Sequence, residues 1–142
     1  MTGRTGGAAR VAGGVLLAGL TACGGPALTP LQSQYQHEAE RALRYHARGE
    51  LPRALVAYQE SLRWAEIADD RPAMLAQDLN VGAVALALGD WALAERSFQR
   101  VQRLATMLSN PEGELRARLG LAQASLRQGW FEAARLAFQQ TL

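Results

Sequence analysis

The sequence predicts an all-α protein of antiparallel helical hairpins, arranged as a solenoid of about three repeats of 40 residues. The first observation behind this prediction is a fixed step, because Gly49, Gly89 and Gly129 are each 40 residues apart. The second is that apolar side chains between these glycines return at spacings of three and four, as on one face of a helix. A step of this length is typical of stacked helical units.

Four further sets of residues keep the same 40-residue step, and all of them are small or apolar. They are the small residues Ala42, Gly82 and Ala122, the alanines Ala54, Ala94 and Ala134, the aromatic residues Tyr58, Phe98 and Phe138, and the larger residues Leu51, Trp91 and Phe131. Because all the sets agree without a gap, we expect one structural register to be shared by the repeats.

The stretches between the glycines are rich in Ala, Leu, Arg and Gln, which favour helices, and no alternating β-branched run suggests a sheet. The expected helices lie near residues 31–48, 51–68, 72–88, 91–108, 111–128 and 131–142.

Residues that end or begin helices punctuate these stretches in order. Each glycine follows the first helix of a hairpin, where the left-handed conformation that ends helices costs glycine nothing. The third, fourth and fifth helices begin with a capping residue, and for two of them a proline in the first turn follows. These starts are Asp70-Arg71-Pro72, Asp90 and Asn110-Pro111.

The motif Gly-x-(Leu/Trp/Phe)-x-x-Ala-x-x-x-(Tyr/Phe) occurs once in each repeat, beginning at Gly49, Gly89 and Gly129. It resembles the tetratricopeptide repeat family, and the resemblance covers residues 33–142. The step of 40 is longer than the 34 residues usual in that family. The resemblance implies that the small residues of each first helix face the alanines of the second, with the aromatic residue filling the space beside them.

In that family the first helices line a concave groove that holds a peptide of a partner protein. When the shared register is applied to this chain, each first helix contributes five groove positions. They are Gln36, Ala39, Leu43, His46 and Ala47 in the first repeat, Ala76, Leu79, Ala83, Leu86 and Ala87 in the second, and Arg116, Leu119, Gln123, Leu126 and Arg127 in the third. The middle of such a groove is apolar and its third repeat adds two arginines, which suits an apolar peptide with an acidic end. The alternative is that these leucines only pack one repeat against the next.

The chain begins with the features of an export signal. Arg4 and Arg10 precede an uncharged stretch, 11–20, which is too short to cross a bilayer as a helix. The following residues, Leu20-Thr21-Ala22-Cys23, resemble a bacterial lipobox. That resemblance implies cleavage before Cys23, diacylglyceryl and N-acyl lipid on this cysteine, and a place in the inner leaflet of the outer membrane, facing the periplasm.

The predicted organisation is therefore a signal peptide at 1–22, a lipidated terminus and tether at 23–32, and the repeat domain at 33–142. The last predicted helix is shorter than the one before it and no capping helix follows. Either the natural chain continues beyond Leu142 or this end packs on another molecule; we favour the first.

Composition argues against several classes of function. Removal of Arg4 and Arg10 from the 15 basic residues leaves 13, equal to the 13 acidic residues, so we expect no nucleic-acid binding. His37 and His46 lie nine residues apart and cannot share a metal ion directly, and Asp69, Asp70 and Asp78 are expected to cap helices. We expect no catalytic residues, no metal, no cofactor and no small-molecule substrate.

The function expected from the sequence is an envelope scaffold that holds other envelope proteins, in pilus or secretin assembly by preference, because lipoproteins with such repeats resemble pilotins. Two alternatives remain. The repeats could be the adaptor part of a longer enzyme or regulator, or they could form a self-associating spacer.

Overall fold

The computed structural model describes residues 27–129, 135–136 and 138–141. The predicted signal peptide, Cys23 as the predicted site of lipid attachment, and Ala134 lie outside the described residues, as does much of the sixth expected helix.

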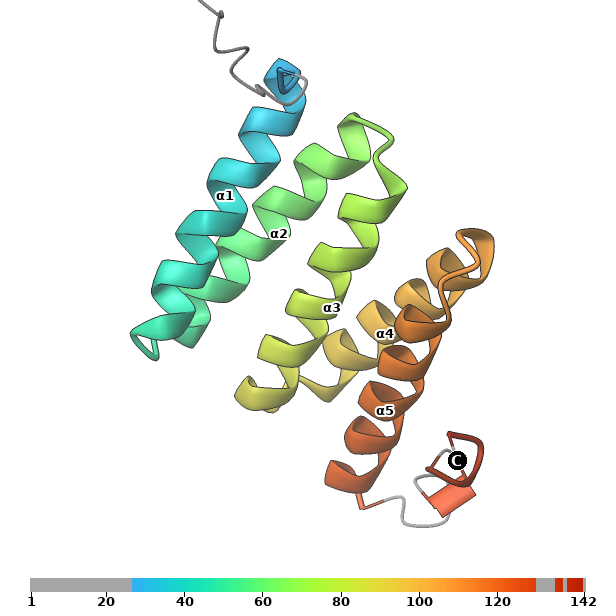
Figure 1. Ribbon diagram of the computed structural model, residues 1–142. Helices are drawn as coiled ribbons and strands as arrows, with labels where there is room; N and C mark the ends of the chain where they lie inside the picture. Colours follow the sequence, from blue (N-terminus) through green and yellow to red (C-terminus); the bar gives the residue numbers. More distant parts are fainter. Residues whose placement is uncertain (1–26, 130–134, 137, 142) are drawn as a thin grey trace, which may run out of the picture.

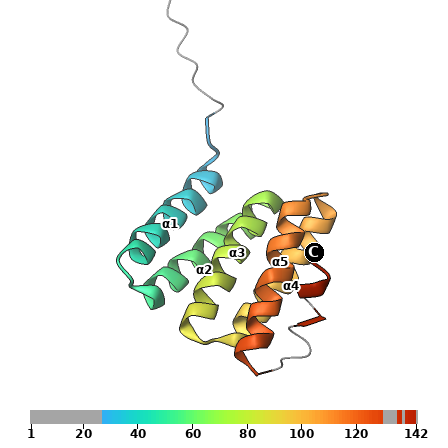
Figure 2. The same cartoon turned by 60° about the horizontal axis from the view of Figure 1, so that its bottom comes forward.

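Within the described residues, five antiparallel α-helices follow one another and stack side by side (Figures 1 and 2). They are α1 (Pro30–Ala47), α2 (Leu51–Ile67), α3 (Arg71–Leu88), α4 (Trp91–Met107) and α5 (Pro111–Arg127). The predicted all-α class and hairpin architecture are confirmed, and the predicted bounds of these helices differ from the observed ones by at most one residue.

The first helix of each hairpin ends at the glycine predicted from the sequence. Gly49, Gly89 and Gly129 have φ angles of 74°, 80° and 79°, in the left-handed region. The second helices of the hairpins end in the same way without glycine, because Asp69 and Ser109 have φ angles of 48° and 51°. These two residues are also 40 apart, so the repeat extends to the links between repeats.

The predicted caps are present at the starts of α3, α4 and α5. Asp70, Asp90 and Asn110 accept hydrogen bonds from the backbone N–H three residues later, at 3.0, 3.0 and 2.9 Å. Thr29 caps α1 in a capping box with Gln32, which the sequence reasoning did not include. The starts of these four helices are thereby fixed relative to the residues before them, whereas α2 begins after Glu50 without a side-chain cap.

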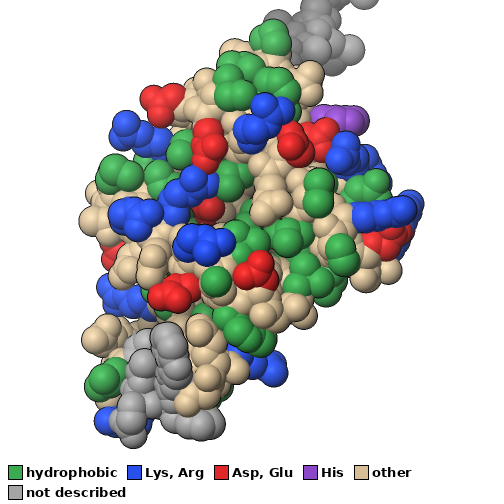
Figure 3. All heavy atoms as spheres, turned by 180° about the vertical axis from the view of Figure 1, so that it is seen from behind, with side chains coloured by type: hydrophobic (Ala, Val, Ile, Leu, Met, Phe, Trp, Pro, Cys, Tyr) green, Lys and Arg blue, Asp and Glu red, His purple; other side chains and the backbone are tan. Residues whose placement is uncertain are grey.

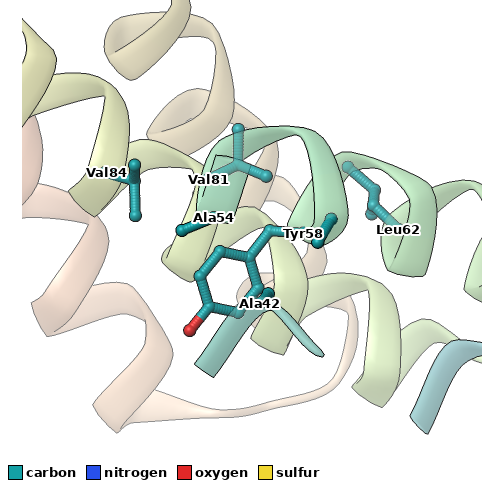
Figure 4. Packing of buried hydrophobic residues seen from close by; sticks show 7 residues of the cluster. Ala42, Ala54, Tyr58, Leu62, Val81 and Val84 are labelled. Atoms are coloured by element: carbon teal, nitrogen blue, oxygen red, sulfur yellow. The ribbon is translucent and has the colours of Figure 1, made fainter. Parts of the chain in front are cut away.

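Small residues bring the helices of a hairpin together. Ala42 of α1 and Ala54 of α2 are fully buried in one cluster, and Ala94 and Ala122 are fully buried in the later repeats. On the face seen from behind, charged side chains of both signs are scattered among hydrophobic and other side chains (Figure 3). Figure 4 shows Tyr58 beside Ala42, with Val81 and Val84 of α3 nearby. The predicted packing register therefore holds in these positions.

The ring of Phe98 lies between α3 and α5. A Cβ atom placed on Gly82 of α3 would lie 2.9 Å from the ring, and one placed on Gly120 of α5 would lie 2.5 Å from it. Because neither glycine has a side chain, the ring fits between two helix backbones, and α5 lies directly beside α3. This close approach positions the site described below.

The prediction for Phe138 is wrong as far as burial is concerned. Tyr58 and Phe98 are 3% and 4% exposed, whereas Phe138 is 37% exposed. A helix of the following repeat covers each of the first two rings, and no such helix exists among the described residues beside Phe138.

None of the helices described combines the length and apolar character that crossing a bilayer requires.

Candidate functional site

A pocket of about 630 Å³ lies between α3 and α5 and is called here the α3–α5 groove. Its residues recur every three or four positions, so they form one face of each helix. They are Leu79, Asn80, Ala83, Leu86 and Ala87 from α3, Phe98 from α4, and Arg116, Leu119, Gly120, Gln123, Leu126 and Arg127 from α5. The volume falls within the range of sites that hold side chains or small ligands.

The groove combines an apolar surface with cationic ends. Leu119 and Leu126 are 37% and 43% exposed, so each leaves a large apolar surface open. Leu79 and Leu86 are half-buried and also pack against core residues. The alternative of repeat-on-repeat packing therefore describes part of the role of the α3 leucines, and the α5 leucines remain open to a ligand.

Two arginines, Arg116 and Arg127, which are the first and last lining residues from α5, give the groove its charge. Arg116 donates a hydrogen bond to Glu112 one turn earlier, at 2.6 Å. Arg127 has no ion pair or hydrogen bond from its side chain within the described part of the chain. An uncompensated guanidinium of this kind is a ready partner for a carboxylate.

The structure brings together the candidate groove residues of the second and third repeats, with the exception of Ala76. It does not bring in those of the first repeat. Leu43 and His46 are exposed on α1, which packs against α2 rather than beside α3. Their assignment to the groove is therefore wrong.

The first repeat differs because its side chains are larger at the point of close approach. Tyr58 and Ala42 take the places that Phe98 and Gly82 have one repeat later, and Asn80 takes the place of Gly120. An asparagine side chain cannot give the aromatic ring the space that glycine gives. We infer that this bulk keeps α1 from lying beside α3 as α3 lies beside α5.

Sequence reasoning missed part of the groove. It omitted Asn80 and Gly120, and it assigned Phe98 to packing alone. Gly120 did carry a clue, because a glycine inside a helix is unfavourable and often marks a close approach of two backbones.

Asp78 was expected to cap a helix, and this expectation is wrong. It lies in the middle of α3, is 2% exposed, and accepts a hydrogen bond from Arg100 of α4. Arg100 also donates to Glu66 at the end of α2. Burial raises the pKa of Asp78 from its ordinary value, and the neighbouring guanidinium opposes that rise. Asp78, Arg100 and Glu66 together join α3, α4 and α2, and their role is structural.

Within residues 27–129 and the short described parts after them, no three His, Cys, Asp or Glu side chains form a group that could hold a metal ion.

Residues 74–142 match the model of the family described as tetratricopeptide repeat. No curated protein and no solved structure matches the chain. The matched residues span α4, α5 and most of α3, so this part of the chain is similar to tetratricopeptide repeats.

Proposed function

We propose that this chain is a lipid-anchored scaffold of the bacterial cell envelope, which holds a partner protein in the α3–α5 groove. Tetratricopeptide repeats indicate protein–protein interaction, and a repeat domain of this kind is typically non-catalytic. The observation that carries the groove proposal is the 630 Å³ pocket, with exposed leucines along it and an arginine near each end.

The proposed occupant is a short segment of a partner protein with apolar side chains and an acidic group. Its apolar side chains would cover Leu119 and Leu126 and reach Phe98 at the base of the groove. Burial of this exposed apolar surface supplies the favourable free energy of binding. A carboxylate of the segment would pair with Arg127, which lacks an acidic partner in the described chain.

Replacing both Arg116 and Arg127 with alanine should lower partner capture by about ten-fold, as expected for the loss of two exposed charge pairs. The measurement places the photocrosslinker p-benzoylphenylalanine at Gln123, an exposed residue of the groove, in living cells of the host bacterium. Crosslinked proteins are then identified and quantified for each variant.

The matched control is the double replacement of Arg53 and Arg63 with alanine. Both arginines are exposed on α2, and each pairs with a glutamate three residues before it. Crosslinking should persist in this control. Equal capture by the groove variant and the wild type, with both proteins folded, would remove the groove from the proposal.

The anchor part of the proposal rests on the Leu20-Thr21-Ala22-Cys23 stretch behind a short apolar leader. Two or three acyl chains on one cysteine make release from a membrane negligible. Among envelope functions, we place the protein with the helpers of pilus and secretin assembly, because repeat-containing lipoproteins resemble the pilotins.

Replacing Cys23 with serine should move the protein out of the membrane fraction or leave the leader uncut. Serine has no thiol to take the diacylglyceryl group, so neither the lipid nor the cleavage that depends on it can follow. Fractionation of cells, together with mass spectrometry of the amino terminus, measures both effects. Membrane fractionation identical to that of the wild type would contradict the anchor while leaving the groove proposal intact.

A further inference from the structure

A second recess, of about 360 Å³, lies between α2 and α4. It is called here the α2–α4 recess. Leu62 of α2, Val81 of α3 and Leu93 of α4 give it an apolar floor. Its charged lining residues are Arg96, Arg100 and Arg103 of α4 and the carboxylate of Asp78 of α3, which is bonded to Arg100. It shares no lining residue with the α3–α5 groove. Figure 3 shows basic side chains, all of them arginines in this chain, across the face seen from behind, with acidic side chains among them.

The arginines of the recess form one stripe, because their spacings of four and three keep them on a single face of α4. Arg100 is already paired with Asp78 and Glu66. Arg96 and Arg103 are exposed and have no ion pair within the described part of the chain. Neither guanidinium group is ion-paired, although the charge of Arg103 acts on the carboxyl of Asp78 and lowers its pKa.

The sequence of α4 explains why these two arginines have no ion-pair partner on their own helix. In the other helices, arginines such as Arg41, Arg63 and Arg118 pair with a glutamate three or four residues before them. The one acidic residue of α4 is Glu95, which hydrogen-bonds to Gln99. No acidic residue stands three or four positions from Arg96 or Arg103.

We propose that the α2–α4 recess is a second docking site, which binds an acidic segment of a partner protein through Arg96 and Arg103. Guanidinium groups match carboxylates in two parallel hydrogen bonds, and added carboxylates would relieve the repulsion along the stripe. The apolar floor provides a place for a neighbouring apolar side chain of the same segment.

A protein segment fits the recess better than a membrane surface does. Anionic lipids are usually bound by four to eight basic residues on a projecting surface. Here only two free arginines are available, and they border a recess with an apolar floor. The protein without its leader is also close to neutral, so no broad positive field draws it to a bilayer.

With docking sites on two different helix pairs, one molecule can hold two partner segments at once. The second site does not depend on the first, because the α3–α5 groove contributes none of its residues.

The test uses the full-length chain and a labelled peptide of alternating glutamate and leucine, with an alternating glutamine and leucine peptide as control. p-Benzoylphenylalanine is placed at Gln99, which lines the recess, or at Gln123, which lines the α3–α5 groove. We expect the acidic peptide to crosslink at position 99, and the glutamine peptide to do so at least about five-fold less.

Replacing Arg96 and Arg103 with glutamine should lower crosslinking at position 99 by about ten-fold and leave crosslinking at position 123 unchanged. Replacing Arg116 and Arg127 with glutamine should leave position 99 unchanged. Circular dichroism melts check that each variant is folded, as expected for exposed side chains. Equal crosslinking by the two peptides, or no loss in the Arg96 and Arg103 variant, overturns the proposal. Displacement of the acidic peptide by phosphatidylglycerol vesicles but not by excess unlabelled peptide also overturns it, in favour of a lipid site.

Discussion

Replacing Arg100 with alanine is expected to lower the free energy of unfolding by about 3 kcal/mol at neutral pH. The substitution leaves the carboxyl group of Asp78 almost fully buried, at 2% exposure, without the guanidinium that is bonded to it in the wild type. The same change also frees Glu66, so the contact that joins α2, α3 and α4 is lost. Urea unfolding followed by circular dichroism measures the effect.

The effect should depend on pH in a defined direction. Burial raises the pKa of Asp78, so the folded state binds a proton more tightly than the unfolded state, whose aspartate has a pKa near 3.8. The stability that this group contributes is fully present below that pH and is lost as pH rises through the folded pKa. Loss of Arg100 raises the pKa further, because its charge lowers it in the wild type. The deficit of the variant should therefore shrink as pH falls toward 4.

Arg63 provides the control for this prediction. It is half-exposed, pairs with Glu60 on its own helix and lies over the ring of Trp64, so its replacement with alanine should cost about 1 kcal/mol or less. Adding Asp78→Asn to the Arg100→Ala variant should recover part of the lost stability at neutral pH and remove its pH dependence. An Arg100→Ala protein as stable as the Arg63→Ala protein would show that Asp78 does not need its partner.

Local chemistry explains why the helices could be predicted so closely. A glycine or a capping side chain acts within a few residues of its own position, so Gly89 and Asp90 mark a helix boundary whatever the rest of the chain does. Because equivalent residues return every 40 positions, a helix boundary found in one repeat could also be placed in the others.

The buried ion pair could not be predicted in this way. Asp78 and Arg100 are 22 residues apart and meet only because α3 and α4 cross at that point. From the sequence, Asp78 was grouped with the aspartates at the nearby turn, and nothing local showed that it would be buried. Long-range contacts of this kind depend on how helices cross, which periodicity alone does not determine.

The groove shows the limit of extending a register from repeat to repeat. The step of 40 placed the residues of α3 and α5 correctly, because Gly82 and Gly120 let these helices approach. The same step did not place Leu43 in the groove. We attribute this to Asn80, which stands where the next repeat has Gly120, because the shared register does not show this difference in side-chain volume. Equivalent positions hold equivalent geometry only while the side chains between them keep the same size.

Replacing Gly120 with alanine is expected to destabilise the protein by about 2 kcal/mol, although alanine favours helices by about 1 kcal/mol over glycine. The new Cβ atom would lie 2.5 Å from three ring atoms of Phe98. The ring cannot easily retreat, because the backbone of Gly82 lies close to the same ring atoms. Thermal and urea unfolding measure the loss, and Gln123→Ala on the same helix, an exposed change, should stay within about 0.5 kcal/mol.

A double-mutant cycle shows whether the ring causes this loss. In a Phe98→Leu background the side chain is smaller, so Gly120→Ala should be neutral or stabilising there, through the helix preference of alanine alone. The coupling between the two positions should then be about 2 kcal/mol or more, since residues in contact deviate from additivity by such amounts. An equal loss in both backgrounds would mean that α5 does not approach α3 over Phe98. The α3–α5 groove would then lose the geometry on which its proposed partner depends.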